Sequence, residues 1–311
     1  MKLQQLRYLV EVYKQGLNVT DAAEKLHTSQ PGISKQIRML EDELGVQVFI
    51  RNGKRVVDVT GPGKEVLRIA ERMLLQAQNL KRIGEEFVQV ENGSLTIATT
   101  HTQARYALPK AIKAFLARYP QVRLALKQGT PTQISEMVVE GVADIAVATE
   151  GIALYPELAM LPCYEWNRSV VVPKGHPLTA LDHLITLEDI AAWPVVTYDF
   201  AFAGRSQINQ AFSAKNLNPT VALSALDTDV IKTYVELGLG VGLIASMAFD
   251  PAKDVNLAVI DAGHLFEPSQ TRIGIRKDAY LRGYVYDFIE LFAPHLTRHK
   301  VQSALMCEDA D

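Results

Sequence analysis

The sequence has little cysteine, no long apolar run and no strong excess of one charge, and each shortage excludes a class of protein. Two cysteines, Cys163 and Cys307, stand in 311 residues, too few for a disulfide framework or a cysteine zinc site, and both are expected to be reduced and structural. No run of about 18 consecutive apolar residues is present, so no membrane-spanning helix is expected. The N-terminus mixes charged with apolar side chains, unlike an export signal, which predicts a cytoplasmic protein.

The charge balance points to a local basic surface and not to a basic protein. The net charge is -3, with 48% hydrophobic and 22% charged residues, as in ordinary soluble globular proteins. Residues 1–60 carry 9 Lys and Arg against 7 Asp and Glu, whereas the other 251 residues carry 23 against 28. Nucleic-acid binding needs a few placed cations and not a high overall pI. The length favours two or three globular units.

The first 60 residues predict three short helices followed by a hairpin. Gly16 ends the first helix (3–15), Asn18 or Thr20 starts the second, and the third runs from an N-cap at Ser29 to Gly45. The apolar residues expected to face their common core are Leu3, Leu6, Leu9, Val10, Tyr13, Ala22, Ala23, Leu26, Ile33, Ile37, Leu40 and Leu44. Two alternating runs then flank Asn52-Gly53, a hairpin signal in which both turn residues adopt positive φ.

A long helix is expected from Thr60 to about Val88. Its apolar and small residues recur at alternating spacings of four and three, at Val66, Ala70, Met73, Ala77, Leu80, Gly84 and Phe87. This seven-residue repeat is typical of a seam that packs against a partner helix. The seam therefore predicts that the helices of two chains pack against each other, in a homodimer or a homotetramer.

From Gly93 the pattern changes to apolar strands that alternate with helical stretches, which favours an α/β region with a parallel sheet. The expected strands are SLTIATT, VRLALKQ, ADIAVAT, SVVVP, PVVTY, VGLIA and TRIGIR. Helices are expected around 108–119 and 133–140, in ITLEDIAAW, after Gly204, over 227–237 and in RGYVYDFIELFAPHL. Residues beyond about Lys300 have weak patterning and are expected to fray.

The polar side of the third predicted helix is suited to reading DNA. A reading helix projects polar side chains from its N-terminal half into the major groove, where Gln30 and Arg38 match the bidentate chemistry of adenine and guanine edges. Cations on the hairpin suit flanking phosphates or the minor groove. The candidate DNA-binding residues are Ser29, Gln30, Pro31, Ser34, Lys35, Arg38, Arg51, Lys54 and Arg55. By periodicity alone, a solvated helix and hairpin remain an equal alternative.

The stretch ATTHTQARYALPKAI predicts an anion site. An apolar strand ends in Thr99, Thr100, His101, Thr102 and Gln103, and a helix follows. Hydroxyls, an amide and the free N–H groups of a helix start can bind sulfate or a small carboxylate without a cationic side chain. Taken alone, the segment fits a capped polar turn at least as well.

Two stretches carry a resemblance to a known family. The segment from LQQLRYLVEV through AAEKLHTSQPGISKQIRMLEDELGVQVFIR to VTGPG resembles the DNA-binding domain of LysR-type transcriptional regulators. The resemblance implies an all-α winged helix-turn-helix (1–59), a long dimerisation helix (60–92) and an α/β effector-binding domain (93–311). That domain would have two lobes like a periplasmic binding protein, lobe I of about 93–163 and 269–311, and lobe II of about 164–268.

The C-terminal motifs are similar to those of the CysB-like subgroup, which controls sulfur assimilation and cysteine biosynthesis. They are THTQARYALP, GTPTQI, ADIAVATE, LPCYEWNR, TDVIKTYVELGLGVGLIASMA and FAPHLTR. The resemblance implies a small effector, such as sulfate, thiosulfate or acetylserine, bound by Thr100, Thr102, Gln103, Thr149 and Trp166. Ala203 stands where the subgroup has a threonine, so one hydroxyl contact to the anion is missing. The same resemblance implies promoter DNA and RNA polymerase as partners.

Other functions receive less support from the residues. Gly238, Gly240 and Gly242 follow a helix and precede a strand, the reverse of a dinucleotide-binding turn, and the seven histidines have no metal-ligand spacing. No nucleophile with a base and an orienting group can be assembled, so neither an enzyme nor a cofactor is expected. Three alternatives stay open: a different anionic effector, a solute-binding protein without a DNA role, and a small-molecule enzyme. The operator, the sign of regulation and the choice between dimer and tetramer are not fixed by the sequence.

Overall fold

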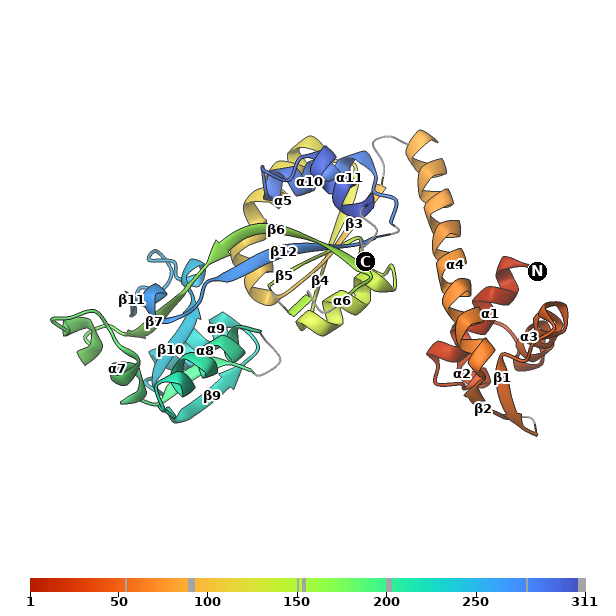
Figure 1. Cartoon of the computed structure of the whole chain (residues 1–311). Helices are drawn as coiled ribbons and strands as arrows, with labels where there is room; N and C mark the ends of the chain where they lie inside the picture. Colours follow the sequence, from red (N-terminus) through yellow and green to blue (C-terminus); the bar gives the residue numbers. More distant parts are fainter. Residues whose placement is uncertain are drawn as a thin grey trace. The chain divides into compact units, whose positions relative to one another are not determined.

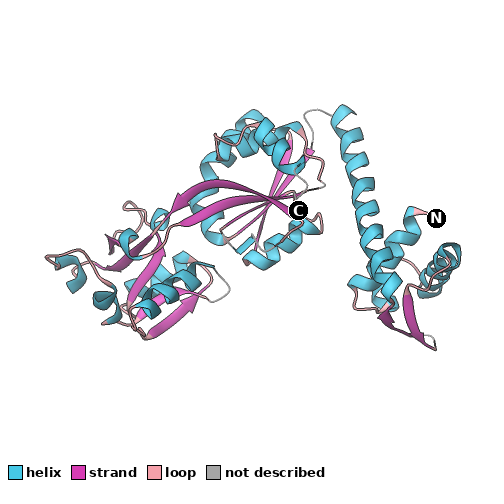
Figure 2. Cartoon of the chain, viewed as in Figure 1, coloured by secondary structure: helices cyan, strands magenta, loops and turns pink. Residues whose placement is uncertain are grey.

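The computed structural model describes residues 1–53, 55–88, 93–149, 151–152, 155–199, 203–277 and 279–306, without the side chains of 85–88 and 203–206. It divides the chain into two compact units, residues 1–87 and 88–311, each described by itself (Figure 1). The first is almost entirely helical, and the second mixes helices and strands (Figure 2). Among the described residues, no helix is both long and apolar enough to span a membrane.

Unit 1 is a three-helix domain with a two-stranded wing and a long final helix. Its elements are α1 (Leu3–Lys14), α2 (Val19–Lys25), α3 (Gln30–Leu44), β1 (Phe49–Asn52), β2 (Arg55–Val59) and α4 (Gly61–Val88). The predicted caps are present, because the Asn18 side chain accepts from the Thr20 and Asp21 amides, and Gly45 closes α3 in the left-handed conformation. Leu9, Ile33 and Leu40 are fully buried in the shared core.

Three predicted core positions and the predicted turn are wrong. Leu3, Tyr13 and Leu44 are exposed, because the buried side of α1 is turned toward Val12 and because α3 ends at Leu44, past the core. Asn52 is not a turn residue, since it pairs with Arg55 at the end of β1 and has no positive φ. Of the two residues expected at positive φ, Gly53 alone adopts it, at 61°.

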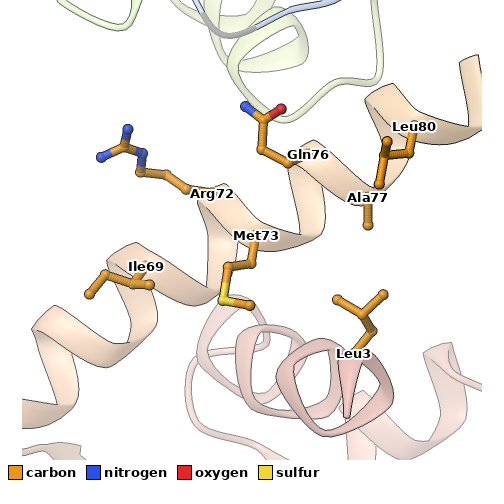
Figure 3. Close-up of a pocket in the computed structure, with 7 residues that line it drawn as sticks. All are labelled: Leu3, Ile69, Arg72, Met73, Gln76, Ala77 and Leu80. Atoms are coloured by element: carbon orange, nitrogen blue, oxygen red, sulfur yellow. The ribbon is translucent and has the colours of Figure 1, made fainter. Parts of the chain in front are cut away.

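The apolar seam of α4 has two environments. Val66, Ala70 and Met73 pack against the core of unit 1, so the first half of the repeat belongs to the three-helix domain itself. Farther along, Leu80 is 71% exposed. A groove with a volume of about 420 Å³ lies between the start of α1 and the middle of α4 (Figure 3). Its lining is mainly apolar and consists of Leu3, Ile69, Arg72, Met73, Gln76, Ala77 and Leu80.

The first lobe of unit 2 is a five-stranded mixed sheet covered on both faces. The strand order is β4 (Val122–Gln128), β3 (Gly93–Thr99), β5 (Ile145–Ala148), β12 (Ser269–Arg276) and β6 (Leu158–Trp166). One face packs against α5 (Leu108–Arg118), α10 (Gly283–Phe292) and α11 (Arg298–Met306). The other face packs against α6 (Pro131–Val139).

The second lobe repeats this plan with a second five-stranded mixed sheet. The strand order is β11 (Leu257–Asp261), β7 (Arg168–Pro173), β10 (Val241–Ala245), β8 (Val195–Tyr198) and β9 (Val221–Ala225). Helices α7 (Leu187–Ala191) and α8 (Ala203–Ala214) pack on one face, and α9 (Thr228–Glu236) packs on the other. The paired strands β6 and β12 lead from the first sheet to the second (Figure 1).

Unit 2 corrects the sequence-based prediction of a parallel sheet. Strand β12 runs antiparallel to β5 and β6, and β7 runs antiparallel to β10 and β11, because the chain returns to each sheet from the other lobe. The sequence-based prediction omits strands β6, β9 and β11, all three of which lie at the edges of their sheets. The expected fraying after Lys300 is also wrong as far as Met306, because Val301 of α11 is fully buried in the lobe I core.

Candidate functional site

The N-terminal half of α3 presents the predicted DNA-reading residues on one side. The Ser29 hydroxyl accepts the Gly32 amide at 3.3 Å, and Pro31 lies in the first turn, so the start of α3 is well defined. Opposite the buried stripe, Ser29, Pro31, Lys35 and Arg38 are exposed, and Gln30 and Ser34 are half-buried. The Gln30 amide donates to the Ser34 hydroxyl at 3.1 Å. The structure therefore brings these six residues together on an accessible face.

The predicted cations of the wing do not share one environment. Arg55 is exposed, and Lys54 lies outside the described residues. Arg51 instead forms an ion pair with Glu41 of α3 at 2.8 Å. The buried Glu41 carboxylate also accepts the Val48 and Phe49 amides at 2.9 and 3.1 Å. Arg51 thus helps to hold the wing on α3.

Glu41 is a residue that the sequence reading missed. Its side chain is 1% exposed, although carboxylates of helices usually face solvent. A signal was present, because position 41 lies four residues after Ile37 on the apolar stripe of α3. A charge at such a position is rarely buried without a partner.

The predicted anion site begins directly after β3. The Thr100 carbonyl accepts the Ala104 amide at 3.0 Å, so a helical turn starts at the strand end. The next residues form a π-helical turn (Gln103–Ala107) that leads into α5, a geometry that is frequent at functional sites. Thr100 is buried and Thr102 is half-buried.

Both polar atoms of the Gln103 side chain form hydrogen bonds within lobe I. It is 1% exposed, its amide nitrogen donates to the Thr271 hydroxyl at 3.0 Å, and its oxygen accepts from the Tyr164 hydroxyl at 2.6 Å. Gln103 therefore fixes the π-helical turn to β6 and β12. One amide hydrogen remains beyond the bond to Thr271.

Thr102 reaches the second lobe. Its hydroxyl oxygen lies 3.3 Å from that of Thr228, at the start of α9, and the Thr228 hydroxyl lies 2.6 Å from the Tyr198 hydroxyl. Burial raises the pKa of Tyr198, so this phenol stays protonated at neutral pH. Thr228 and Tyr198 are polar groups of the site that sequence reasoning missed, because they come from distant segments.

The remaining predicted ligand residues lie at element ends. Thr149 follows the last residue of β5 and is half-buried, and Trp166 is the last residue of β6. The Trp166 indole nitrogen is buried without a hydrogen-bond partner among the described residues. Ala203 begins α8, but its side chain lies outside the described residues. Trp166 packs against the hydrophobic cluster that contains Tyr198, so it shares a neighbourhood with the Thr102–Thr228 contact.

An ionic contact joins the two lobes beside Thr102. The Tyr106 hydroxyl donates to the Asp229 carboxylate at 2.6 Å, and Arg105 and Lys232 are the cations beside it. Burial alone would raise the pKa of Asp229, but the Tyr106 hydrogen bond and the two cations outweigh it, so this pKa is lowered. Asp229 is therefore ionised at neutral pH.

The region around Asp229 also contains a cluster of possible metal ligands that the sequence did not predict. Atoms of His101, Asp227 and Asp229 that could ligate a metal lie within 4.8 Å of one another. Asp229 is already paired with cations, and Asp227 caps α9 by accepting the Val230 amide at 2.8 Å. The protein's own contacts account for both carboxylates.

A wing beside an exposed polar helix, followed by a two-lobed α/β unit, defines a DNA-binding regulator with an effector-binding domain. Two family models match this chain: the bacterial regulatory helix-turn-helix protein of the lysR family over residues 3–64, and the LysR substrate binding domain over residues 89–297. The chain belongs to the LysR family of transcriptional regulators.

Curated relatives agree over the full length. The chain is 53% identical to the HTH-type transcriptional regulator SsuR of Burkholderia cenocepacia, covering 98% of this chain and 99% of that protein. It is 51% identical to the HTH-type transcriptional regulator CysB of the same organism, covering 99% and 98%. Both relatives are named as transcriptional regulators and not as enzymes.

Solved structures support the fold. The crystal structure of the cofactor-binding domain of the Cbl transcriptional regulator covers 70% of this chain and 95% of that chain, with 44% identity and a TM-score of 0.67. Full-length OxyR C199D from Pseudomonas aeruginosa covers 100% of both chains with 22% identity and a TM-score of 0.63, which shows likeness of fold alone. The predicted class, a helix-turn-helix followed by a two-lobed α/β domain, is confirmed.

Proposed function

We propose that the protein regulates genes of sulfur assimilation or cysteine biosynthesis and that a small anion bound between residues of the two lobes controls it. The observation that carries the proposal is the buried Trp166 indole N–H, which has no hydrogen-bond partner among the described residues and belongs to a side chain packed against the cluster that contains Tyr198. The Tyr198 hydroxyl is linked through the Thr228 hydroxyl to that of Thr102. A buried donor that lacks an acceptor is costly unless a ligand or water satisfies it. The similarity to CysB, SsuR and Cbl supports sulfur-related control.

The donors favour a small anion with several acceptor oxygens. Thr100, Thr102, Gln103, Thr149 and Trp166 offer neutral donors, and the helical turn after β3 adds positive potential. Sulfate, thiosulfate and the carboxylate of acetylserine all fit this chemistry. A different small anionic effector is the alternative, because Ala203 provides no hydroxyl.

Titration of the full chain with sulfate, thiosulfate and acetylserine tests the effector. Thr102→Ala should weaken binding and Ala203→Thr should strengthen it, each by up to about 1.5–3 kcal/mol for a hydrogen bond to a charged group. Thr179→Ala is the matched control, because among the described residues the Thr179 hydroxyl bonds only the nearby His176 carbonyl, at 2.7 Å. Equal affinity of the parent and both site variants would remove Thr102 and Ala203 from the site.

We further propose that α3 reads promoter DNA in the major groove and that the wing contacts flanking phosphates. Gln30 and Arg38 carry the base contacts, and Ser29, Ser34, Lys35 and Arg55 contact phosphates or bases. A homodimer or homotetramer with an interface along α4 would present two such helices to the operator. The effector acts by favouring one arrangement of subunits, and RNA polymerase is the expected downstream partner.

A further inference from the structure

Arg168 is a buried cation at the point where the chain passes between the lobes. It is 1% exposed and is the first residue of β7, separated from the end of β6 by Asn167 alone. Burying an ion is unfavourable unless its charge and its donors are satisfied, so the contacts of a buried arginine usually have a specific use. None of the proposed effector contacts accounts for it.

The guanidinium group ties three elements together. One terminal nitrogen of Arg168 donates to the Gln207 side-chain oxygen of α8 at 2.6 Å and to the Ser269 hydroxyl of β12 at 2.8 Å. The other donates to the Glu267 carbonyl at 3.0 Å. The Ser269 hydroxyl also donates to the Gln207 oxygen at 3.0 Å, which closes a triangle. The rigid planar fork of arginine suits such divergent acceptors, whereas lysine does not.

The same group supports Trp166. The guanidinium carbon lies 5.3 Å from the centre of the Trp166 ring and 5.8 Å from that of Phe266, both within the range of cation–π contacts. Ser269 pairs with Trp166 across β6 and β12. Arg168 therefore contacts the Trp166 ring and, through Gln207, the helix α8 that begins at Ala203.

We propose that Arg168, acting through Gln207, is a positioning residue that fixes the Trp166 indole and α8 relative to each other for effector binding. This inference rests on the proposed function for its ligand, but the positioning itself is a property of the ligand-free protein. Fixed donors lose less entropy on binding, and a misaligned donor forfeits its hydrogen bond.

Gln207→Met is the informative variant, because it removes the acceptor while keeping the side-chain length and a residue favourable to helices. Ser169→Ala is the control, since it removes the 2.8 Å Ser169–Ser246 hydroxyl contact at the same crossover, and among the described residues that hydroxyl bonds neither Gln207 nor Trp166. In calorimetry on the full chain, Gln207→Met should weaken sulfate binding about tenfold or more, and Ser169→Ala by less than about twofold. Gln207→Glu, which keeps the acceptor, should restore most of the affinity.

Two readouts need no ligand. In a Trp193→Phe background Trp166 is the single tryptophan, and Gln207→Met should change its emission and its acrylamide quenching, whereas Ser169→Ala should not. Backbone amides of α8 should also exchange hydrogen faster in Gln207→Met alone.

The outcomes separate the two hypotheses. If the parent binds sulfate and Gln207→Met matches it in affinity, emission and exchange, the positioning role is overturned. If the parent binds none of the three anions, the proposed effector fails, and emission and exchange then decide the positioning role by themselves.

Discussion

Arg38 shows what can be tested at the scale of one residue. It is exposed on the polar side of α3, one turn beyond Ser34. If it pairs with a base, Arg38→Ala should weaken operator binding by roughly 1–3 kcal/mol and alter the preference at one base pair, because a bidentate contact discriminates by that amount. Titrations with operator and random DNA measure this. An equal loss on both would leave Arg38 as a phosphate contact.

At the scale of elements, Glu41 connects α3 to the wing. Glu41→Ala leaves the Val48 and Phe49 amides and Arg51 without their buried acceptor. Loss of one member of a buried ion pair costs about 3–5 kcal/mol, so denaturant unfolding should show a drop of this size. Glu43→Ala is the control, since the Glu43 side chain is 52% exposed and its ion pair with the N-terminal amine lies at the surface, so stability should change by less than about 1 kcal/mol. A similar small change for Glu41→Ala would contradict its structural role.

The proposed interface along α4 can be tested with a substitution that leaves the hydrophobic core of unit 1 intact. Met73 packs on that core, so a charge there would also destabilise unit 1, but Leu80 is mostly exposed. Leu80→Glu should dissociate the dimer, because it places like charges in an apolar seam. Light scattering at micromolar concentration gives the mass, with the exposed Gln78→Glu as the control. A native mass for Leu80→Glu would exclude this part of α4 from the interface.

At the scale of the whole molecule, the Asp229 contact between the lobes should make stability depend on pH. A lowered pKa in the folded state means that the unfolded chain binds more protons, so the contribution of Asp229 is present above the unfolded pKa of about 4 and is lost as pH falls through the folded value. Asp229→Asn should therefore lower the Tm at pH 7 more than at pH 3. Asp182→Asn serves as the control, because the Asp182 side chain is fully exposed. Equal shifts at both pH values would contradict the ionic role.

Local signals in the sequence were sufficient for much of the fold. Caps act on neighbouring residues, so Asn18, Ser29 and Gly45 placed the helix ends correctly. Periodicity reports which side of an element is buried, and it found the stripe of α3 from Ile33 to Leu40. The predicted polar stretch after β3 likewise lies at a strand end, where a helical turn begins.

Tertiary structure decided what depends on contacts between distant segments. The direction of β12 follows from the return of the chain from the second lobe, and no periodicity encodes it. By residue type, Gln103 is suited to contact an anion and Arg51 to contact DNA. In the fold, Gln103 instead bonds Thr271, which is 168 residues away, and Arg51 bonds Glu41, which is 10 residues away. The sequence by itself determined most of the elements, the polar side of α3 and the family resemblance, because those signals are local. Only the packed fold joined Thr102 to Thr228 and Arg168 to Gln207, since hydrogen bonds between segments far apart in the sequence depend on distances that the chain acquires on folding.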